Sequence, residues 1–89
     1  MALGKENTEI QRYTNEAVAF ATNGQWQEAV SANKAILELS PSDVDAYNRL
    51  GRALMQQGEY IESKEAYNRA LELDPYNSIA TKNLDRLSV

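Results

Sequence analysis

Apolar side chains recur along this chain at the three- and four-residue intervals of an amphipathic helix. Ile10, Tyr13, Ala17 and Phe20 set this spacing in the first stretch. No stretch alternates with the period of two that is typical of a half-buried strand. Glycine or proline interrupts the pattern between stretches. The pattern therefore predicts an all-α chain with helices at about 9–22, 26–39, 43–57, 60–73 and 78–87.

The expected helix ends carry local signals. Gly24 and Gly58 follow two of the stretches, and glycine readily adopts the left-handed conformation that closes a helix. Thr8 and Ser42 each open a segment typical of a capping box, in which the hydroxyl accepts a hydrogen bond from the first turn. We therefore expect Thr8 and Ser42 to cap the first and third helices.

A 34-residue offset relates the two halves of the chain. The segment Leu37-Glu38-Leu39-Ser40-Pro41 returns as Leu71-Glu72-Leu73-Asp74-Pro75, and the same offset pairs Tyr13 with Tyr47. A fixed period of this length is typical of stacked repeats, in which each unit is too small to bury its own apolar face. Stacked repeats usually present a surface to a partner, which favours a role in protein interaction.

The same register predicts the core. Small residues at the equivalent positions Ala17 and Gly51 should let neighbouring helices approach closely. We expect large apolar side chains to fill the space between layers, each contributing on the order of 1.5–3 kcal/mol. They are Tyr13, Phe20, Trp26, Tyr47, Leu50, Leu54, Tyr60, Tyr67, Leu71 and Leu73.

Composition excludes several kinds of chemistry. The 89-residue chain has a net charge of −4, so we expect no binding to nucleic acid or membrane, which requires a basic surface. It contains no histidine and no cysteine, which excludes Ser–His and Cys–His dyads and imidazole or thiolate metal sites. Carboxylate pairs such as Glu59 and Glu62 lie in a polar stretch and should be solvated. We expect no enzyme activity, cofactor or metal, and a cytoplasmic location because no signal peptide or membrane-spanning run is evident.

The second repeat resembles the tetratricopeptide repeat through Tyr47, Leu50-Gly51, Leu54, Gly58, Tyr60, Ser63, Tyr67, Ala70 and Pro75. The first repeat follows the family less closely and departs from it at Glu16, Asn33 and Ile36. The resemblance covers about 8–87 and implies an α-solenoid of two tetratricopeptide helix–turn–helix repeats plus a C-terminal capping helix. It divides a single domain at 8–88 into repeat one (about 10–43), repeat two (about 44–77) and the capping helix (about 78–88), after an N-terminal extension at 1–7.

The resemblance also implies a concave groove, lined by the first helix of each repeat, that binds a peptide segment of a partner. The groove positions are Gln11, Thr14, Val18, Ala21 and Thr22, then Asp45, Asn48, Arg52, Met55 and Gln56, then Ile79, Lys82 and Arg86, with Arg49 at the edge.

Charge at these positions suggests the ligand. Arg52 and Arg86 are separated by one full repeat period and should occupy equivalent places on adjacent layers, with Lys82 one turn before Arg86. A guanidinium pairs with a carboxylate in bidentate fashion, so we expect an acidic peptide or a C-terminal carboxylate, with Asn48 bonding the peptide backbone. The other interpretation is that these cations only solvate helix faces.

The family's chaperone-binding carboxylate clamp is incomplete here. The clamp has a lysine and an asparagine on the first helix, where this chain has Thr14 and Val18. A full third repeat, which supplies the remaining clamp cations, is also missing. We therefore do not expect binding to the C-termini of chaperones.

Self-association is the alternative function. Two repeats and a cap form a limited core, and unburied end faces such as that of Ile10 and Met1-Ala2-Leu3 favour stacking of chains or a homodimer. The module could equally act as a spacer within a larger protein.

Overall fold

The computed structural model describes the backbone of residues 2–88 and the side chains of residues 7–88. In this part of the chain it contains five helices and no strand: α1 (Ala2–Thr22), α2 (Trp26–Leu39), α3 (Val44–Gln56), α4 (Tyr60–Leu73) and α5 (Ser78–Leu87). The predicted bounds of α2, α4 and α5 are confirmed, and α3 differs by one residue at each end. The all-α prediction is confirmed.

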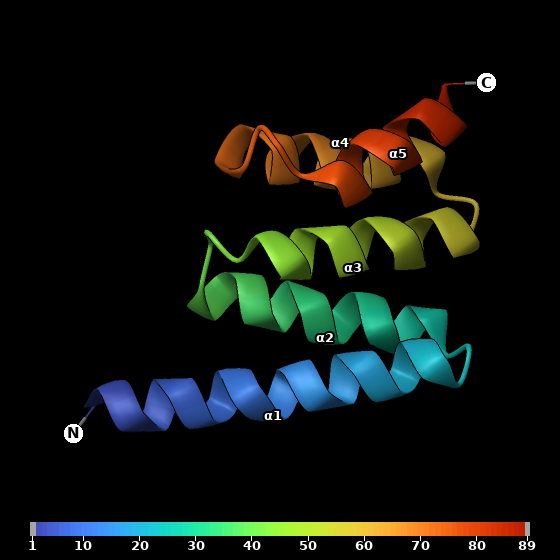
Figure 1. Cartoon of the computed structure of the whole chain (residues 1–89). Coiled ribbons are helices and arrows are strands. Elements are labelled where there is room, and N and C mark those ends of the chain that lie inside the picture. The colour runs from blue at the N-terminus through green and yellow to red at the C-terminus, as the bar shows by residue number, and fades with distance from the viewer. Residues whose placement is uncertain (1, 89) are drawn as a thin grey trace.

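Each helix packs mainly on the helices that adjoin it in the sequence (Figure 1). Helices α1 to α4 run back and forth as a stack, and α5 lies against α4 at one end of it. Helix α1 also touches α3, so the first helices of the two repeats are neighbours. The resulting molecule is elongated, with principal extents of 47, 29 and 17 Å.

Helix α1 begins earlier than the sequence predicts. It is helical from Ala2, so Thr8 lies inside the helix, and the prediction that Thr8 caps it is wrong. Ala2, Leu3, Lys5 and Glu6 are strong helix formers, and no proline separates them from Thr8. Residues 2–7 therefore continue α1. The predicted apolar edge at Met1-Ala2-Leu3 concerns side chains outside the described residues.

Aspartate and asparagine side chains cap the N-termini of α3, the first helix of the second repeat, and of α5, the C-terminal helix. The Asp43 side chain accepts a hydrogen bond from the Ala46 N–H (3.0 Å), and the Asn77 side chain accepts one from the Ala80 N–H (2.9 Å). The prediction that Ser42 caps α3 is therefore wrong by one residue, because the Asp43 carboxylate fills the capping role. Gly24 and Gly58 have φ values of 72° and 79°, which confirms the left-handed turns.

Small residues dominate the enclosed core. Ala17, Ala46 and Ala70 are fully buried, together with Ile36 and Tyr67. A Cβ atom added to Gly51 would lie 2.8 Å from the Tyr67 ring. This distance is shorter than a van der Waals contact, so the absence of a side chain at Gly51 allows α3 and α4 to pack this closely.

Two predicted core residues face solvent. Tyr60 is 57% exposed and Leu73 is 37% exposed, so their assignment to the core is wrong. Leu39 is the counterpart of Leu73 in the first repeat and is equally exposed, which shows that the last residue of each second helix points outward. Tyr60 begins α4 and lines a pocket with Arg86 and Leu87 at the end of α5.

Candidate functional site

A pocket of about 280 Å³ lies between α3 and α5. Helix α3 supplies four lining residues at helical spacing, which places them on one face. Helix α4 supplies one residue, and α5 closes the other side. The lining residues are Asp45, Asn48, Arg49, Arg52, Tyr67, Ile79 and Asn83.

The structure brings together only some of the predicted groove residues. Asn48, Arg49 and Arg52 share this pocket. Arg86 borders a neighbouring pocket of about 420 Å³ with Met55, Tyr60 and Leu87. Lys82 is exposed on α5, Thr14 is half-buried on α1 and Val18 is 49% exposed, and none of these three lines either pocket.

Two arginines of the pocket are held by other side chains. The Arg49 Nε donates a hydrogen bond to the Asn33 Oδ1 at 3.0 Å, and Asn33 is buried in α2. The Arg52 guanidinium lies 5.4 Å from the centre of the Trp26 ring, in a cation–π arrangement. Trp26 itself is half-buried.

The arginines at the two pockets form no ion pair with a carboxylate of the described residues. Among residues 7–88, the ion pairs within 4.0 Å join Arg12 to Glu16 and Arg69 to Glu72. Within that range Arg49, Arg52 and Arg86 therefore lack such a pair, although Asp45 lines the same pocket.

Two buried polar atoms at the pocket have no hydrogen-bond partner within the described part of the chain: the Tyr67 hydroxyl and the Asn48 Oδ1. The Asn48 Nδ2 donates to the Asn77 Oδ1 at 3.0 Å, which ties α3 to the cap of α5. Burial raises the pKa of Tyr67 to about 12, while the charges of Arg52 and Arg86 act in the opposite direction.

Sequence reasoning missed Tyr67, Asn83 and the contact of Trp26 with Arg52. Asn83 stands one repeat period after Arg49, so the repeat register could have identified it. Tyr67 lies on a second helix, where the register indicates core packing, and no sequence signal marks its hydroxyl as part of a pocket.

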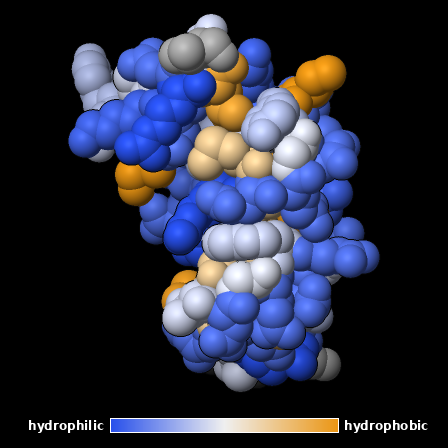
Figure 2. All heavy atoms as spheres, turned by 90° about the vertical axis from the view of Figure 1, so that its right-hand side faces the viewer, coloured by the Kyte–Doolittle hydropathy of each residue, from blue (hydrophilic) through white to orange (hydrophobic). Residues whose placement is uncertain are grey.

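The surface around the helix turns is mostly polar. Figure 2 shows the end of the molecule where the α1–α2 and α3–α4 turns lie, with hydrophilic atoms over most of it and hydrophobic atoms in separate patches. None of the described helices is long and apolar enough to cross a membrane. Within the described residues, no three or more acidic side chains gather in a way that could hold a metal ion.

Comparison with known proteins gives clear relatives. The chain is 39% identical over 72 residues to small glutamine-rich tetratricopeptide repeat-containing protein 2 of Mycosarcoma maydis, covering 81% of this chain and 20% of that protein. It is 31% identical over 75 residues to heat shock protein STI1 of Saccharomyces cerevisiae, covering 84% of this chain and 13% of that protein. The chain thus spans a fifth or less of these relatives.

A solved structure shares the fold over almost the whole chain. The first tetratricopeptide domain of Spaghetti (RPAP3), bound to the HSP90 peptide SRMEEVD, superposes with a TM-score of 0.82 at 30% identity, covering 98% of this chain and 80% of that one. The tetratricopeptide repeat profile matches residues 14–78. The two helical hairpins and the closing helix α5 therefore place this chain in the tetratricopeptide repeat family.

Proposed function

We propose that this chain is a non-catalytic interaction module that binds an acidic peptide segment of a partner protein between α3 and α5. The observation that carries the proposal is that Arg49 and Arg52 line one pocket and Arg86 lines another beside α3, and that none of the three has a carboxylate within 4.0 Å among the described residues. These three cations stand out on a chain whose net charge is −4.

The chemistry of the site supports an acidic ligand. Arg52 is stacked on Trp26 and Arg49 is hydrogen-bonded to Asn33, so both guanidinium groups lose little conformational freedom when they bind a carboxylate. The HSP90 peptide bound by the RPAP3 domain, SRMEEVD, carries three acidic residues. A related fold therefore accommodates a ligand of this charge.

The cations come from α3 and α5, because Thr14 and Val18 leave the matching positions of α1 uncharged. We therefore propose that acidic side chains within a segment are recognised, and that a free C-terminus is not required. Lys82 and Arg86, exposed on α5, extend the positive surface beyond the pocket. Lys82, Thr14 and Val18 remain predictions as contact residues.

Fluorescence anisotropy with labelled SRMEEVD tests this proposal. The peptide serves as a source of acidic side chains and not as a chaperone C-terminus, because the carboxylate clamp is incomplete in this chain. Replacing Arg52→Gln removes one guanidinium, and we expect binding to weaken about tenfold, which corresponds to about 1.4 kcal/mol. A C-terminally amidated peptide should bind as well as the free acid, whereas a peptide with Gln and Asn in place of its acidic residues should bind far more weakly.

Arg12→Gln is the matched control, because Arg12 lies on α1 beside Glu16 and outside the pocket. We expect it to leave affinity unchanged. Thermal melts of each variant should show that the fold persists. Equal affinity of the wild type and Arg52→Gln would contradict the proposal.

Self-association, or a spacer role in a larger protein, is the second candidate. The observation in its favour is the exposure of Tyr60, Ile61 and Tyr76, at 57%, 77% and 94%. Sedimentation velocity over a hundredfold concentration range tests for a homodimer: a constant monomer mass would remove it. The cytoplasmic location stays a prediction from the sequence.

A further inference from the structure

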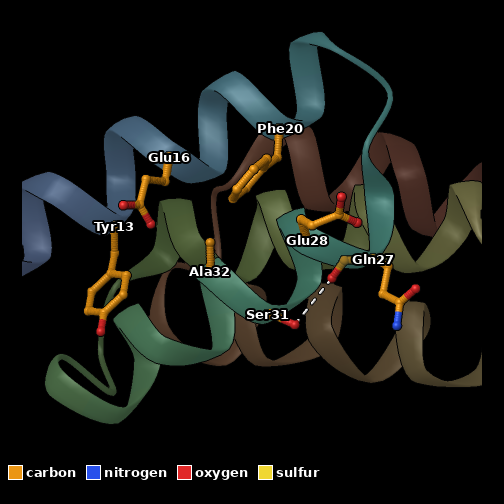
Figure 3. A pocket seen from close by; sticks show the side chains of 7 residues that line it. All are labelled: Tyr13, Glu16, Phe20, Gln27, Glu28, Ser31 and Ala32. Atoms are coloured by element: carbon orange, nitrogen blue, oxygen red, sulfur yellow. Dashed lines mark hydrogen bonds between the residues drawn. The ribbon is translucent and has the colours of Figure 1, made fainter.

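A second hollow lies away from the groove, between the two helices of the first repeat. We name it the N-terminal slot and define it by Tyr13, Glu16 and Phe20 of α1 and Glu28 and Ala32 of α2. Its volume is about 510 Å³. Figure 3 shows Glu16 and Phe20 projecting from α1 toward α2, and Ala32 projecting from α2 toward α1.

The N-terminal slot does not share its residues with the peptide groove. Thr14 and Val18 lie roughly 100° or more around α1 from Tyr13 and Phe20, because successive residues of a helix turn by about 100°. A ligand of the slot would therefore not occupy the groove between α3 and α5.

The second repeat contains the same hollow, but there a helix fills it. Tyr47, Leu54 and Ala66 are the counterparts of Tyr13, Phe20 and Ala32 at the repeat offset. Leu54 and Ala66 belong to a core cluster against which Tyr47 packs, together with two side chains of α2, Val30 and Leu37. What remains is a pocket of about 230 Å³, in which Lys34 of α2 lies with Glu62 and Glu65.

We propose that the N-terminal slot binds an amphipathic helix of a partner protein in the way that the second repeat holds α2. No helix in the described part of this chain covers the slot. The partner helix carries two apolar side chains at the spacing of Val30 and Leu37, and a lysine or arginine between them, in the place of Lys34.

The acidic side chains of the N-terminal slot support a lysine or arginine on the partner helix. Glu28 is the counterpart of Glu62, which lines the filled hollow together with Lys34 without forming an ion pair within 4.0 Å. Glu16 replaces the apolar Leu50, and its side chain is 42% exposed whereas Leu50 is 7% exposed. Glu16 is paired with Arg12, whereas Glu28 has no ion pair within 4.0 Å among the described residues. The slot therefore combines an apolar floor with one unpaired carboxylate, Glu28, which suits a cationic amphipathic helix better than a purely apolar one.

A second copy of this chain is a poorer occupant. The required pattern stands on α2, but in each copy α2 is already packed between α1 and α3. Its Val30 and Leu37 are engaged with the second repeat. A second copy could supply this face only by opening its own core, which favours a helix from another protein.

The test uses a hydrocarbon-stapled peptide with the sequence of α2, residues 26–39, as a stand-in for the partner helix. Circular dichroism first establishes that the peptide is helical. We expect saturable binding to the full chain, and about tenfold weaker binding when either the peptide carries Lys34→Glu or the protein carries Glu28→Lys. Combining the two reversals should restore the affinity, which a general loss of stability would not do.

Several outcomes separate this inference from the groove proposal. Arg52→Gln should leave the α2 peptide bound, and Glu28→Lys should leave the acidic peptide bound. Absence of saturable binding by the helical peptide at millimolar concentration, or affinity unaffected by either charge reversal, would overturn the inference. Dimerisation that Glu28→Lys abolishes would also overturn it, by making a second copy the occupant.

Discussion

Tyr67 is the largest side chain that the described part of the fold encloses completely. Its ring fills the space left by Gly51, while its hydroxyl ends beside the groove without a hydrogen-bond partner among the described residues. The first repeat solves the same packing problem differently, because Ala17 and Asn33 occupy the equivalent positions. The second repeat thus pairs the smaller Gly51 with the larger Tyr67, whereas the first repeat pairs the larger Ala17 with the smaller Asn33.

The buried hydroxyl predicts an unusual response to pH. Burial raises the pKa of Tyr67 from 10.0 to about 12, so the fold favours the neutral phenol. The contribution is complete below pH 10, the ordinary pKa, and is lost as the pH rises through about 12. We expect the free energy of unfolding to fall by on the order of 2 kcal/mol over this range, and Tyr67→Phe to lack that loss.

Urea unfolding at several pH values measures both effects. At pH 7, Tyr67→Phe should be as stable as the wild type or up to about 1 kcal/mol more stable, because an unpaired hydroxyl is removed while the ring is kept. A loss greater than about 1 kcal/mol at pH 7 would mean that the hydroxyl makes a hydrogen bond.

The close approach at Gly51 makes a second prediction. Gly51→Ala gains about 1 kcal/mol of helix propensity but places a methyl group 2.8 Å from the Tyr67 ring, so we expect a net loss of about 1–2 kcal/mol. Chemical denaturation measures the loss. In a Tyr67→Leu background the same substitution should cost less, and an equal cost in both backgrounds would argue against the steric explanation.

At the scale of helices, a hydrogen bond between two side chains, Asn33 and Arg49, joins α2 to α3. Asn33 is 1% exposed and stands at a position where the first repeat departs from the family pattern. Its Nδ2 donates to the Ala29 carbonyl at 2.9 Å, and its Oδ1 accepts from Arg49 at 3.0 Å. A residue at which the first repeat departs from its family thus holds Arg49, an arginine of the proposed groove.

We expect Asn33→Ala to destabilise the fold by about 1–3 kcal/mol, because it removes a buried amide and leaves Arg49 without its acceptor. It should also weaken acidic-peptide binding by freeing Arg49. Asn83→Ala is the control for the unfolding energy only, because Asn83 lines the pocket: it is the counterpart of Arg49, and its amide donates to the Ile79 carbonyl of its own helix. Equal free energies of unfolding for the two variants would contradict a stabilising role for the hydrogen bond between Asn33 and Arg49.

The sequence predicts elements best where a local signal ends them. Prolines and glycines end α2 and bound α4, and their predicted limits agree with the structure. Thr8 failed as a start signal because a capping motif works only if the preceding residues are not helical, and helix formers precede it. Ser42 failed because Asp43, also a good cap, lies directly after it.

The candidate site was only partly predictable for a related reason. Repeat register placed Asn48, Arg49 and Arg52 on one face, since that depends on spacing along one helix. The contributions of Tyr67 and Trp26 depend on how different helices meet, which spacing does not specify. The N-terminal slot was signalled only by Glu16, a charged residue at an apolar position of the repeat.

At the scale of the whole molecule, the two proposed surfaces divide the charges. Arginines gather between α3 and α5, and carboxylates edge the N-terminal slot. A protein with an acidic segment and a protein with a basic amphipathic helix could therefore bind together, because the sites share no residue. The net charge of −4 alone does not reveal that positive and negative side chains gather on different surfaces.

The arrangement of each helix against its sequence neighbours also bears on how the chain reaches its structure. Contacts between nearby residues form without closing long loops, so the conformational search is short. Helical proteins with such local contacts commonly fold within microseconds to milliseconds. A hairpin formed early can then serve as a template on which the next one condenses, so assembly can spread along the chain from either repeat.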